Sequence, residues 1–534
     1  KGSYSFGSNN FYENNYMLSL NARKDNLWGK WGGAASLFGQ IMTTKSEYKV
    51  TDIGQLIVPN VFNPNNGISN PAIRATPSKK QINSIFATAE LSYNNLWFLN
   101  LTGRNDWSSA LSKKNRSFFY PSVNTSLILT DLITKNGGTL PDWWNYAKIR
   151  GSYAAVGNDL DPYQLINTYK LEKDPNGNTV TSREDVKYNE DIKSELIKTI
   201  EAGIETRFFE NRLGVDFTWY KTNATNQIID VPMDPFSGFQ RQYINAGNIE
   251  NKGIEISLNA KILNTPEKLN WNMDINFSKN RNRILELSEV TKTYNLIALE
   301  NISVKADEGH DYGEIFGSTY QRVTDPNNQF FGKMILGANG LPLEGASTFL
   351  GKQNPSALLG ITNSFSYKNI GLSFLVDGRF GGKFFSGTNA ALQQAGAAAV
   401  TVVNGNRDKF VVDGVVSDGK GGYVNNTTEV NPQQYWAAIG NPNLGITERN
   451  MYDATNIRLR NLSLSYSFPS STLKNSIIQR AKISLTANNV WMIISHANGV
   501  DPESVFAISS NAVGFENFST PTARSYFLNV TIGF

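Results

Sequence analysis

The chain contains no cysteine and only two histidines, His310 and His496. The absence of cysteine excludes a disulfide framework, a thiol nucleophile and a metal site built on thiolates. The two histidines lie far apart in the sequence, and no HExxH, GxSxG or phosphate-loop motif occurs, so nothing groups a nucleophile with a base. The sequence therefore predicts a protein that is not an enzyme, with no catalytic residues, no cofactor and no metal site.

Long apolar runs are also absent, and no stretch reaches the roughly 18 consecutive apolar residues of a membrane-spanning helix. The nearest approach, 390–403, is interrupted by two glutamines and a glycine. A membrane-spanning strand needs only about 9–11 residues with every second one apolar, so a mean hydropathy of −0.34 still allows a barrel. Neither sign of charge dominates, because 50 basic and 46 acidic residues leave a net charge of +4. This balance argues against a nucleic-acid partner.

What the chain has in abundance is alternation of apolar and polar residues. Ala87, Ala89 and Leu91 alternate with Thr88 and Glu90, and the same pattern resumes after a turn at 94–95. About fifteen strands follow this template, many of ten or more residues with aromatic residues near their ends. A soluble sandwich or propeller also alternates, but over shorter strands. The pattern favours a transmembrane antiparallel β-barrel of the all-β class.

The connections between these strands alternate in length, as in outer-membrane barrels, where short turns are periplasmic and long loops extracellular. Short turns are expected near Asn26, Asn94, Glu210, Thr265, Asn369 and Ser470. Long loops are expected at 45–81, 157–198, 223–252, 286–355, 381–453 and 493–523.

The last strand carries one apolar face that ends in the final residue. That face consists of Tyr526, Leu528, Val530, Ile532 and Phe534. Such a strand resembles the recognition signal of the barrel-assembly machinery, although an ordinary edge strand has the same alternation.

Seven motifs, in order over about residues 95 to 534, resemble the SusC/RagA group of TonB-dependent transporters. They are Gly103-Arg-Asn-Asp-Trp-Ser-Ser109 with Ser117-Phe-Phe-Tyr-Pro-Ser-Val123, Lys148-Ile-Arg-Gly-Ser-Tyr153 with Val156-Gly-Asn-Asp159, Asn245-Ala-Gly247, Asn251-Lys-Gly-Ile-Glu255, Arg379-Phe-Gly-Gly382, Ile457-Arg-Leu-Arg-Asn461 and Asp501-Pro-Glu503. Each motif alone is weak, and their order and spacing make the combination specific.

This resemblance implies a barrel of 22 strands around an N-terminal plug, of which the whole chain, 1–534, is the C-terminal portion. No signal peptide opens the chain, so we expect the plug and about seven strands upstream. The resemblance also implies a multi-pass protein of the cell outer membrane, in contact with its lipid. It implies import of oligosaccharides or oligopeptides with a SusD-like surface lipoprotein, the TonB complex acting through the plug, and a dimer of transporter–lipoprotein pairs. The alternative is a SusC-like scaffold subunit that imports nothing.

Candidate contact residues are few. Arg104, Asp106 and Trp107 are expected at the extracellular rim, where they contact a ligand or partner, or form a turn with an ion pair and an interfacial anchor. Arg379 is expected on the polar interior face and is a further candidate for ligand contact. The other members of that face are Glu201, Glu205, Arg207, Asp216, Asn259, Asn272, Asp274 and Asn276.

Overall fold

The computed structural model describes residues 2–265, 268–289, 291–299, 301–402, 405–440, 445–474, 476–504 and 513–534. Strands make up 61% of the chain and helices 8%, which confirms the all-β class. Among the described residues, no helix is both long and apolar enough to cross a membrane.

One large sheet contains fifteen strands that follow one another in chain order, and β9 (Val186–Lys187) joins β12 from the side. The fifteen are β1 (Ser3–Trp28), β2 (Trp31–Gln55), β3 (Ala72–Tyr93), β4 (Trp97–Ser108), β5 (Ser117–Ile128), β6 (Trp144–Asn158), β10 (Glu195–Phe208), β11 (Leu213–Pro232), β12 (Arg241–Leu263), β13 (Leu269–Glu286), β18 (Ala357–Tyr367), β19 (Ile370–Phe380), β26 (Asn456–Ser467), β27 (Arg480–Ser495) and β29 (Ser525–Gly533). Within the described residues β1 pairs only with β2 and β29 only with β27, so the sheet has two free edges. The closed barrel of 22 strands and the plug remain predictions.

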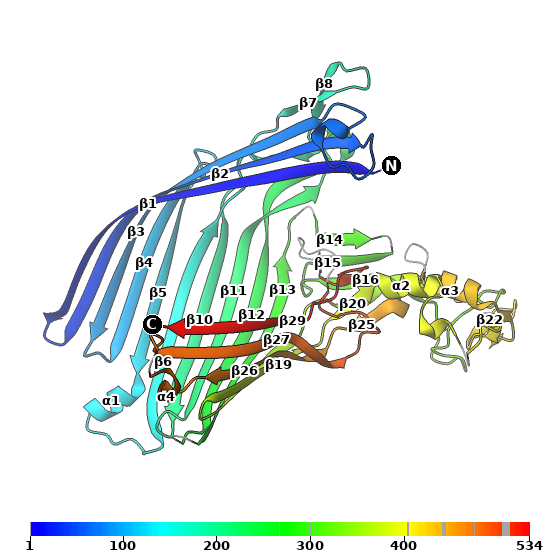
Figure 1. Cartoon of the computed structure of the whole chain (residues 1–534). Helices are drawn as coiled ribbons and strands as arrows, with labels where there is room; N and C mark the ends of the chain where they lie inside the picture. The colour runs from blue at the N-terminus through cyan, green and yellow to red at the C-terminus, as the bar shows by residue number, and fades with distance from the viewer. Residues whose placement is uncertain are drawn as a thin grey trace. The chain divides into compact units, whose positions relative to one another are not determined.

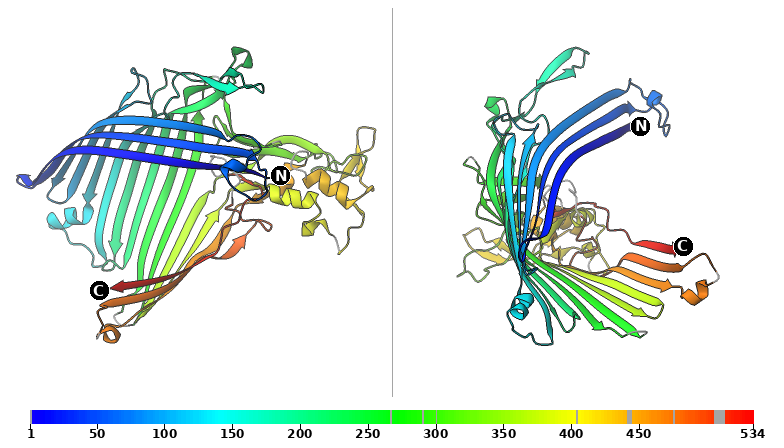
Figure 2. Two further views of the ribbon diagram at one scale, coloured as in Figure 1. Left: turned by 45° about the horizontal axis from the view of Figure 1, so that its top comes forward. Right: turned by 90° about the vertical axis from the view of Figure 1, so that its left-hand side faces the viewer.

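The chain divides into two compact units, and the first comprises residues 1–136, 148–202 and 222–248. Its strands β1 to β6 are antiparallel neighbours and β1 to β5 lie side by side in both views (Figures 1 and 2). A small buried cluster forms where Leu111, Leu160 and Ile192 meet. The remaining elements of this unit are η1 (Pro64–Asn66), α1 (Leu129–Lys135), η2 (Pro235–Ser237) and the hairpin of β7 (Tyr169–Lys173) and β8 (Thr179–Arg183).

The second unit comprises residues 137–147, 203–221 and 249–534. Its strands β13, β18, β19, β26, β27 and β29 pair antiparallel in chain order. The loops 287–356 and 381–455, together called the cap here, fold into small sheets and helices (Figure 1). Ile302, Ile315 and Phe515 are among the residues of a buried core that joins the cap to the last loop.

The elements of the cap and its surroundings are short. They are β14 (Thr293–Leu299), β15 (Ile302–Asp307), β16 (Glu314–Tyr320), β17 (Glu344–Lys352), β20 (Lys383–Ser386), α2 (Gly387–Gln394), η3 (Ala399–Thr401), β21 (Phe410–Val411), β22 (Val415–Ser417), β23 (Tyr423–Asn425), β24 (Glu429–Val430), α3 (Pro432–Gly440), η4 (Thr447–Asn450), β25 (Met451–Asp453), α4 (Ser470–Leu473) and β28 (Phe515–Glu516).

The expected short turns are largely present. Asn94, Glu210 and Lys368 have positive φ, the left-handed conformation that closes such turns. The turn expected near Asn26 lies slightly later, because β1 continues to Trp28 and Gly29 has the positive φ. Pro266, in the turn expected near Thr265, lies outside the described residues.

Two of the expected long loops are mostly strand. Within 45–81, β2 continues to Gln55 and β3 begins at Ala72, so the pairing extends to Asp52 opposite Ala72. Within 223–252, β11 continues to Pro232 and β12 begins at Arg241. Backbone hydrogen bonds continue a ladder whether or not its side chains are apolar, so the end of hydrophobic alternation does not mark the end of a strand. The other four loops begin and end within a few residues of the expected bounds.

Candidate functional site

Strand β26 carries two arginines, Arg458 and Arg460, on its polar face, and a β-bulge lies at Arg460. Leu459 lies opposite Val376 in β19 and Trp491 in β27, whereas the next paired residue of β26 is Asn461. Arg460 is therefore an extra residue, and a bulge redirects the side chain at its position. Arg458 and Arg460 both contact Glu503, which places them on the same face of the sheet.

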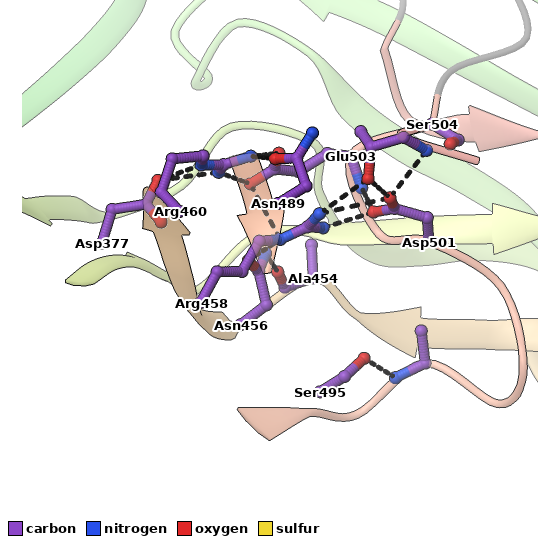
Figure 3. Close-up of polar contacts among 12 residues, drawn as sticks. Asp377, Ala454, Asn456, Arg458, Arg460, Asn489, Ser495, Asp501, Glu503 and Ser504 are labelled. Atoms are coloured by element: carbon purple, nitrogen blue, oxygen red, sulfur yellow. Dashed lines mark hydrogen bonds and ion pairs between the residues drawn. The ribbon is translucent and has the colours of Figure 1, made fainter. Parts of the chain in front are cut away.

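Arg458 holds the loop that follows β27. Its side chain is 4% exposed and forms an ion pair with Asp501, itself 8% exposed (Figure 3). The Nη1 of Arg458 also donates to Thr522 Oγ1 at 3.2 Å. Asn456 Oδ1 accepts from Arg458 Nε at 3.0 Å. Burial by itself raises the pKa of Asp501, but hydrogen bonds from Arg458 and Thr522 lower that pKa more, and it lies well below its usual range. Asp501 is therefore ionised at any physiological pH.

Arg460 joins the same loop to the neighbouring strand. Its guanidinium donates to Asp377 Oδ2 of β19 at 2.9 and 2.7 Å, and to the carboxylate of Glu503 at 3.0 and 2.8 Å (Figure 3). A planar guanidinium matches two carboxylates in this way, whereas a lysine ammonium does not. Asp377, Arg460 and Glu503 thus form one ionic cluster that fixes residues 501–503 against the polar face.

A polar groove of about 620 Å³ lies beside this ionic cluster. Its lining includes Asp377, Arg379 and Glu503 together with Asp216 and Glu255. Arg379 donates to Gln353 O at 3.2 Å, but its buried Nε and the buried Oδ1 of Asp377 have no hydrogen-bond partner among the described residues. Buried polar atoms of this kind are suited to hydrogen bonds with a group that enters the groove. Four carboxylates line the groove, and Arg460 pairs with two of them, Asp377 and Glu503.

The cap contains a second hollow, of about 770 Å³, with aromatic and charged walls. Arg322 donates to both oxygens of Glu448 at 3.0 and 2.9 Å, and the backbone N–H of Tyr320 donates to the same carboxylate at 3.0 Å. Burial raises the pKa of Glu448, but these hydrogen bonds outweigh it and lower the pKa. The ring of Phe349 lines the hollow and is 49% exposed. An exposed ring beside fixed polar groups suits capture of a sugar or peptide.

The candidates Arg104 and Asp106 lie inside β4 rather than at a turn, because β3 and β5 pair on either side of them. Arg104 Nε forms an ion pair with Asp106 Oδ1 at 2.8 Å, and its Nη2 donates to Ser84 Oγ at 2.8 Å. Tyr120 donates to Asp106, and Arg104 also stacks on the ring of Phe86. The expected ion pair is present, and ligand or partner contact at these residues remains a prediction.

Trp107 follows Asp106 on the strand and so points to the opposite face of the sheet, where it is half-buried. The structure therefore separates Trp107 from the Arg104–Asp106 pair. The apolar residues of the last strand lie in β29, and Phe534 follows it. All five are exposed, from Ile532 at 47% to Phe534 at 74%. Their role as an assembly signal remains a prediction.

The residues described by the structure hold no group of three or more metal-binding side chains. His310 Nδ1 lies 3.3 Å from Glu314 and its side chain is 60% exposed. His496 follows β27 at the start of a loop. The arrangement offers hydrogen bonds and charge for binding.

Sequence reasoning missed the central cluster of Arg458, Arg460, Asp377, Asp501 and Glu503. A signal was present, because Ile457-Arg-Leu-Arg-Asn461 and Asp501-Pro-Glu503 are two of the seven motifs. Nothing in the sequence indicated that these two motifs touch, since about 40 residues separate them and the bulge depends on pairing with β19 and β27.

An antiparallel sheet of this length, polar on one face and apolar on the other, with folded loops at one end, defines a β-barrel protein of the outer membrane. Residues 1–490 match the family described as TonB dependent receptor-like, beta-barrel, and the chain belongs to that family. Within it the chain is of the SusC/RagA type, an outer-membrane protein, as the motifs predicted.

Relatives support this assignment. TonB-dependent receptor P3 of Formosa agariphila is 25% identical over 488 residues, 86% of this chain and 46% of its own length. TonB-dependent receptor SusC of Bacteroides thetaiotaomicron is 25% identical over 486 residues, 86% of this chain and 44% of its own length. The chain therefore spans about half the length of these curated relatives. The RagAB peptide transporter has the same fold, with a TM-score of 0.77 at 18% identity, covering 99% of this chain and 56% of that one.

Proposed function

We propose that the protein imports oligosaccharides or oligopeptides across the outer membrane as a SusC-like, TonB-dependent transporter. Import would use a SusD-like surface lipoprotein as a partner and the TonB complex as the source of energy, acting through a plug. The pairs of transporter and lipoprotein would associate as a dimer. The observation that carries the proposal is the family match over residues 1–490 together with the seven SusC/RagA motifs.

The cap supports a role in capture of extended polar cargo. Its hollow combines Phe349 with the fixed pair of Arg322 and Glu448, and both aromatic faces and charged groups bind sugars or peptides. The similarity in fold to the RagAB peptide transporter supports oligopeptides as one of the two proposed cargo classes. The cap, 287–356 and 381–455, is also where we place contact with the lipoprotein.

Affinity purification of the native full-length protein from detergent-solubilised outer membranes, followed by mass spectrometry, tests the partner. We expect a stoichiometric SusD-like lipoprotein. Recovery with secretion or barrel-assembly components in its place, without such a lipoprotein, would contradict the importer and favour a scaffold.

Uptake of labelled oligopeptides and oligosaccharides by cells tests the activity itself. We expect uptake by the parent strain and none in a strain that lacks the gene or lacks TonB. Phe349→Ala in the hollow should weaken uptake at low cargo concentration, whereas Phe331→Ala, another exposed ring outside the hollow, should not. Equal uptake with and without TonB would exclude active import.

A further inference from the structure

A group of basic side chains gathers on the apolar face of the sheet in the second unit, in the middle of β11 and β12 and in the half of β13 nearer its long loop. This basic patch consists of Lys221 of β11, Lys252 of β12, and Lys279, Arg281 and Arg283 of β13. Successive side chains of a strand alternate between faces, so Lys279 shares its face with Phe277, and Lys252 shares its face with Ile254. The opposite face is polar, as hydrogen bonds from Ser257 to Asn276 and from Asn259 to Asp274 show.

The patch has an excess of positive charge. Lys221 pairs with Glu250 at 2.8 Å, and Arg281 pairs at 3.1 Å with Asp311, a carboxylate that Lys352 also contacts. The exposed ammonium groups of Lys252 and Lys279 have no hydrogen-bond or ion-pair partner among the described residues. Five cations therefore face two carboxylates, and two of the cations are available to an external anion.

A groove of about 460 Å³ lies between these cations. Lys252, Lys279, Arg281 and Arg283 line it, together with Trp219. A strand rises about 3.4 Å per residue, so Lys252 lies roughly 7 Å from Ile254 and Lys279 roughly 7 Å from Phe277, in each case on the side away from the short turn. Cations at that depth, beside a tryptophan, occupy the level of lipid headgroups. Because the long loops of an outer-membrane barrel are extracellular, that level belongs to the outer leaflet.

We propose that the basic patch binds the phosphate groups of an anionic glycolipid of the outer leaflet, with the acyl chains against the apolar face below it. The positive charge of the patch complements a phosphate group. Because the groove is continuous with the lipid-facing strands, a lipid phosphate fits it better than a soluble anion does. The proposal rests on the outer-membrane location of the family and is independent of the cargo, so loss of import would not affect it.

The test uses the full-length protein purified in detergent and titrated with lipid A carrying two phosphates, with binding measured by native mass spectrometry. The variant K252Q/K279Q removes the two unpartnered cations, and neither change breaks a contact of the fold. The matched control K261Q/K482Q removes the same charge from exposed lysines at the short-turn end of β12 and β27. Each basic residue near an anionic membrane surface contributes to the affinity for lipid. Loss of two such residues should therefore weaken binding of lipid A about thirty-fold.

We expect tight binding by the unmodified protein and by the control, and weak binding by K252Q/K279Q. Dephosphorylated lipid A should bind weakly to the unmodified protein and to K252Q/K279Q alike. Millimolar inorganic phosphate should not displace lipid A from the unmodified protein. Equal affinities of K252Q/K279Q and the unmodified protein would overturn the proposal. Tight binding of dephosphorylated lipid A, or displacement by inorganic phosphate alone, would overturn the assignment to a lipid phosphate.

Discussion

The polar face of the sheet carries an arginine cluster in each unit, and the two are built differently. The Arg104 cluster draws its partners Asp106, Ser84 and Tyr120 from β3, β4 and β5, so strand pairing alone assembles it. The cluster around Arg458 and Arg460 needs Asp501 and Glu503, which lie in a loop. A cluster built from strands reinforces pairing that already exists, whereas a cluster that includes a loop determines where that loop lies.

The largest effect is expected from Arg458→Met, which leaves Asp501 buried without its cation. Breaking a buried ion pair destabilises by about 3–5 kcal/mol, so loop 496–504 should open far more readily. Hydrogen exchange of the purified full-length protein should show faster exchange in this loop. Arg104→Met is the control and should leave the loop unchanged. Unaltered exchange in Arg458→Met would show that other contacts hold the loop.

The pH dependence of the same loop follows from Asp501. Its pKa is lowered in the folded state, so its stabilising contribution is complete above the ordinary carboxyl pKa, about 3.9, and is lost as pH falls through the lower folded value. Protection of loop 496–504 should therefore be constant from neutral pH to about pH 5 and decrease only in strong acid. Asp501→Asn should weaken protection at neutral pH and remove the decrease in acid.

A smaller effect is expected at Arg460, whose side chain is 26% exposed and whose partner Asp377 is 30% exposed. A double-mutant cycle of Arg460→Gln and Asp377→Asn should give a coupling free energy of about 1 kcal/mol, measured by exchange in the loop. The same cycle can be repeated in a Glu503→Gln background. Loss of the coupling there would show that Glu503 and Asp377 act on Arg460 as one unit. A zero coupling in the parent would mean that Arg460 contributes through Glu503 alone.

Arg104→Lys should have a similar or smaller effect, confined to β2, β3, β4 and β5, the strands whose residues Arg104 contacts. Lysine keeps a charge beside Asp106 but loses the planar contacts with Ser84 and Phe86, at a cost of about 1 kcal/mol. Exchange in β4 should rise slightly while loop 496–504 stays protected. Faster exchange in that loop would contradict the independence of the two clusters.

The smallest effect is expected at Lys114, which pairs with Asp191 at 3.1 Å with both side chains about three-quarters exposed, at 76% and 74%. Solvent screens such pairs, and many contribute nothing measurable. Lys114→Gln should leave exchange in both clusters unchanged. A clear loss of protection would show that this ion pair stabilises the fold despite its exposure to solvent.

The family and fold class could be predicted from the sequence, because they depend on local patterns. Alternation around Ala87, turn residues such as Asn94, and the seven motifs each reflect a rule that acts over a few residues. The site could be predicted only in part. An ion pair of Arg104 and Asp106 was one of the two expectations, but in a turn at the rim, and their position inside β4 between β3 and β5 was not predicted.

By itself, the sequence determined that this protein is an all-β chain of the SusC/RagA type. Strand alternation and turn conformation each depend on a few consecutive residues, so both can be recognised locally. Only the tertiary structure decided that Arg458 meets Asp501, because that contact joins a bulged strand to a distant loop. It also decided that the basic patch assembles from three strands, and that β2 and β3 continue well into the expected loop 45–81. Each of these depends on pairing between segments, which no single segment specifies.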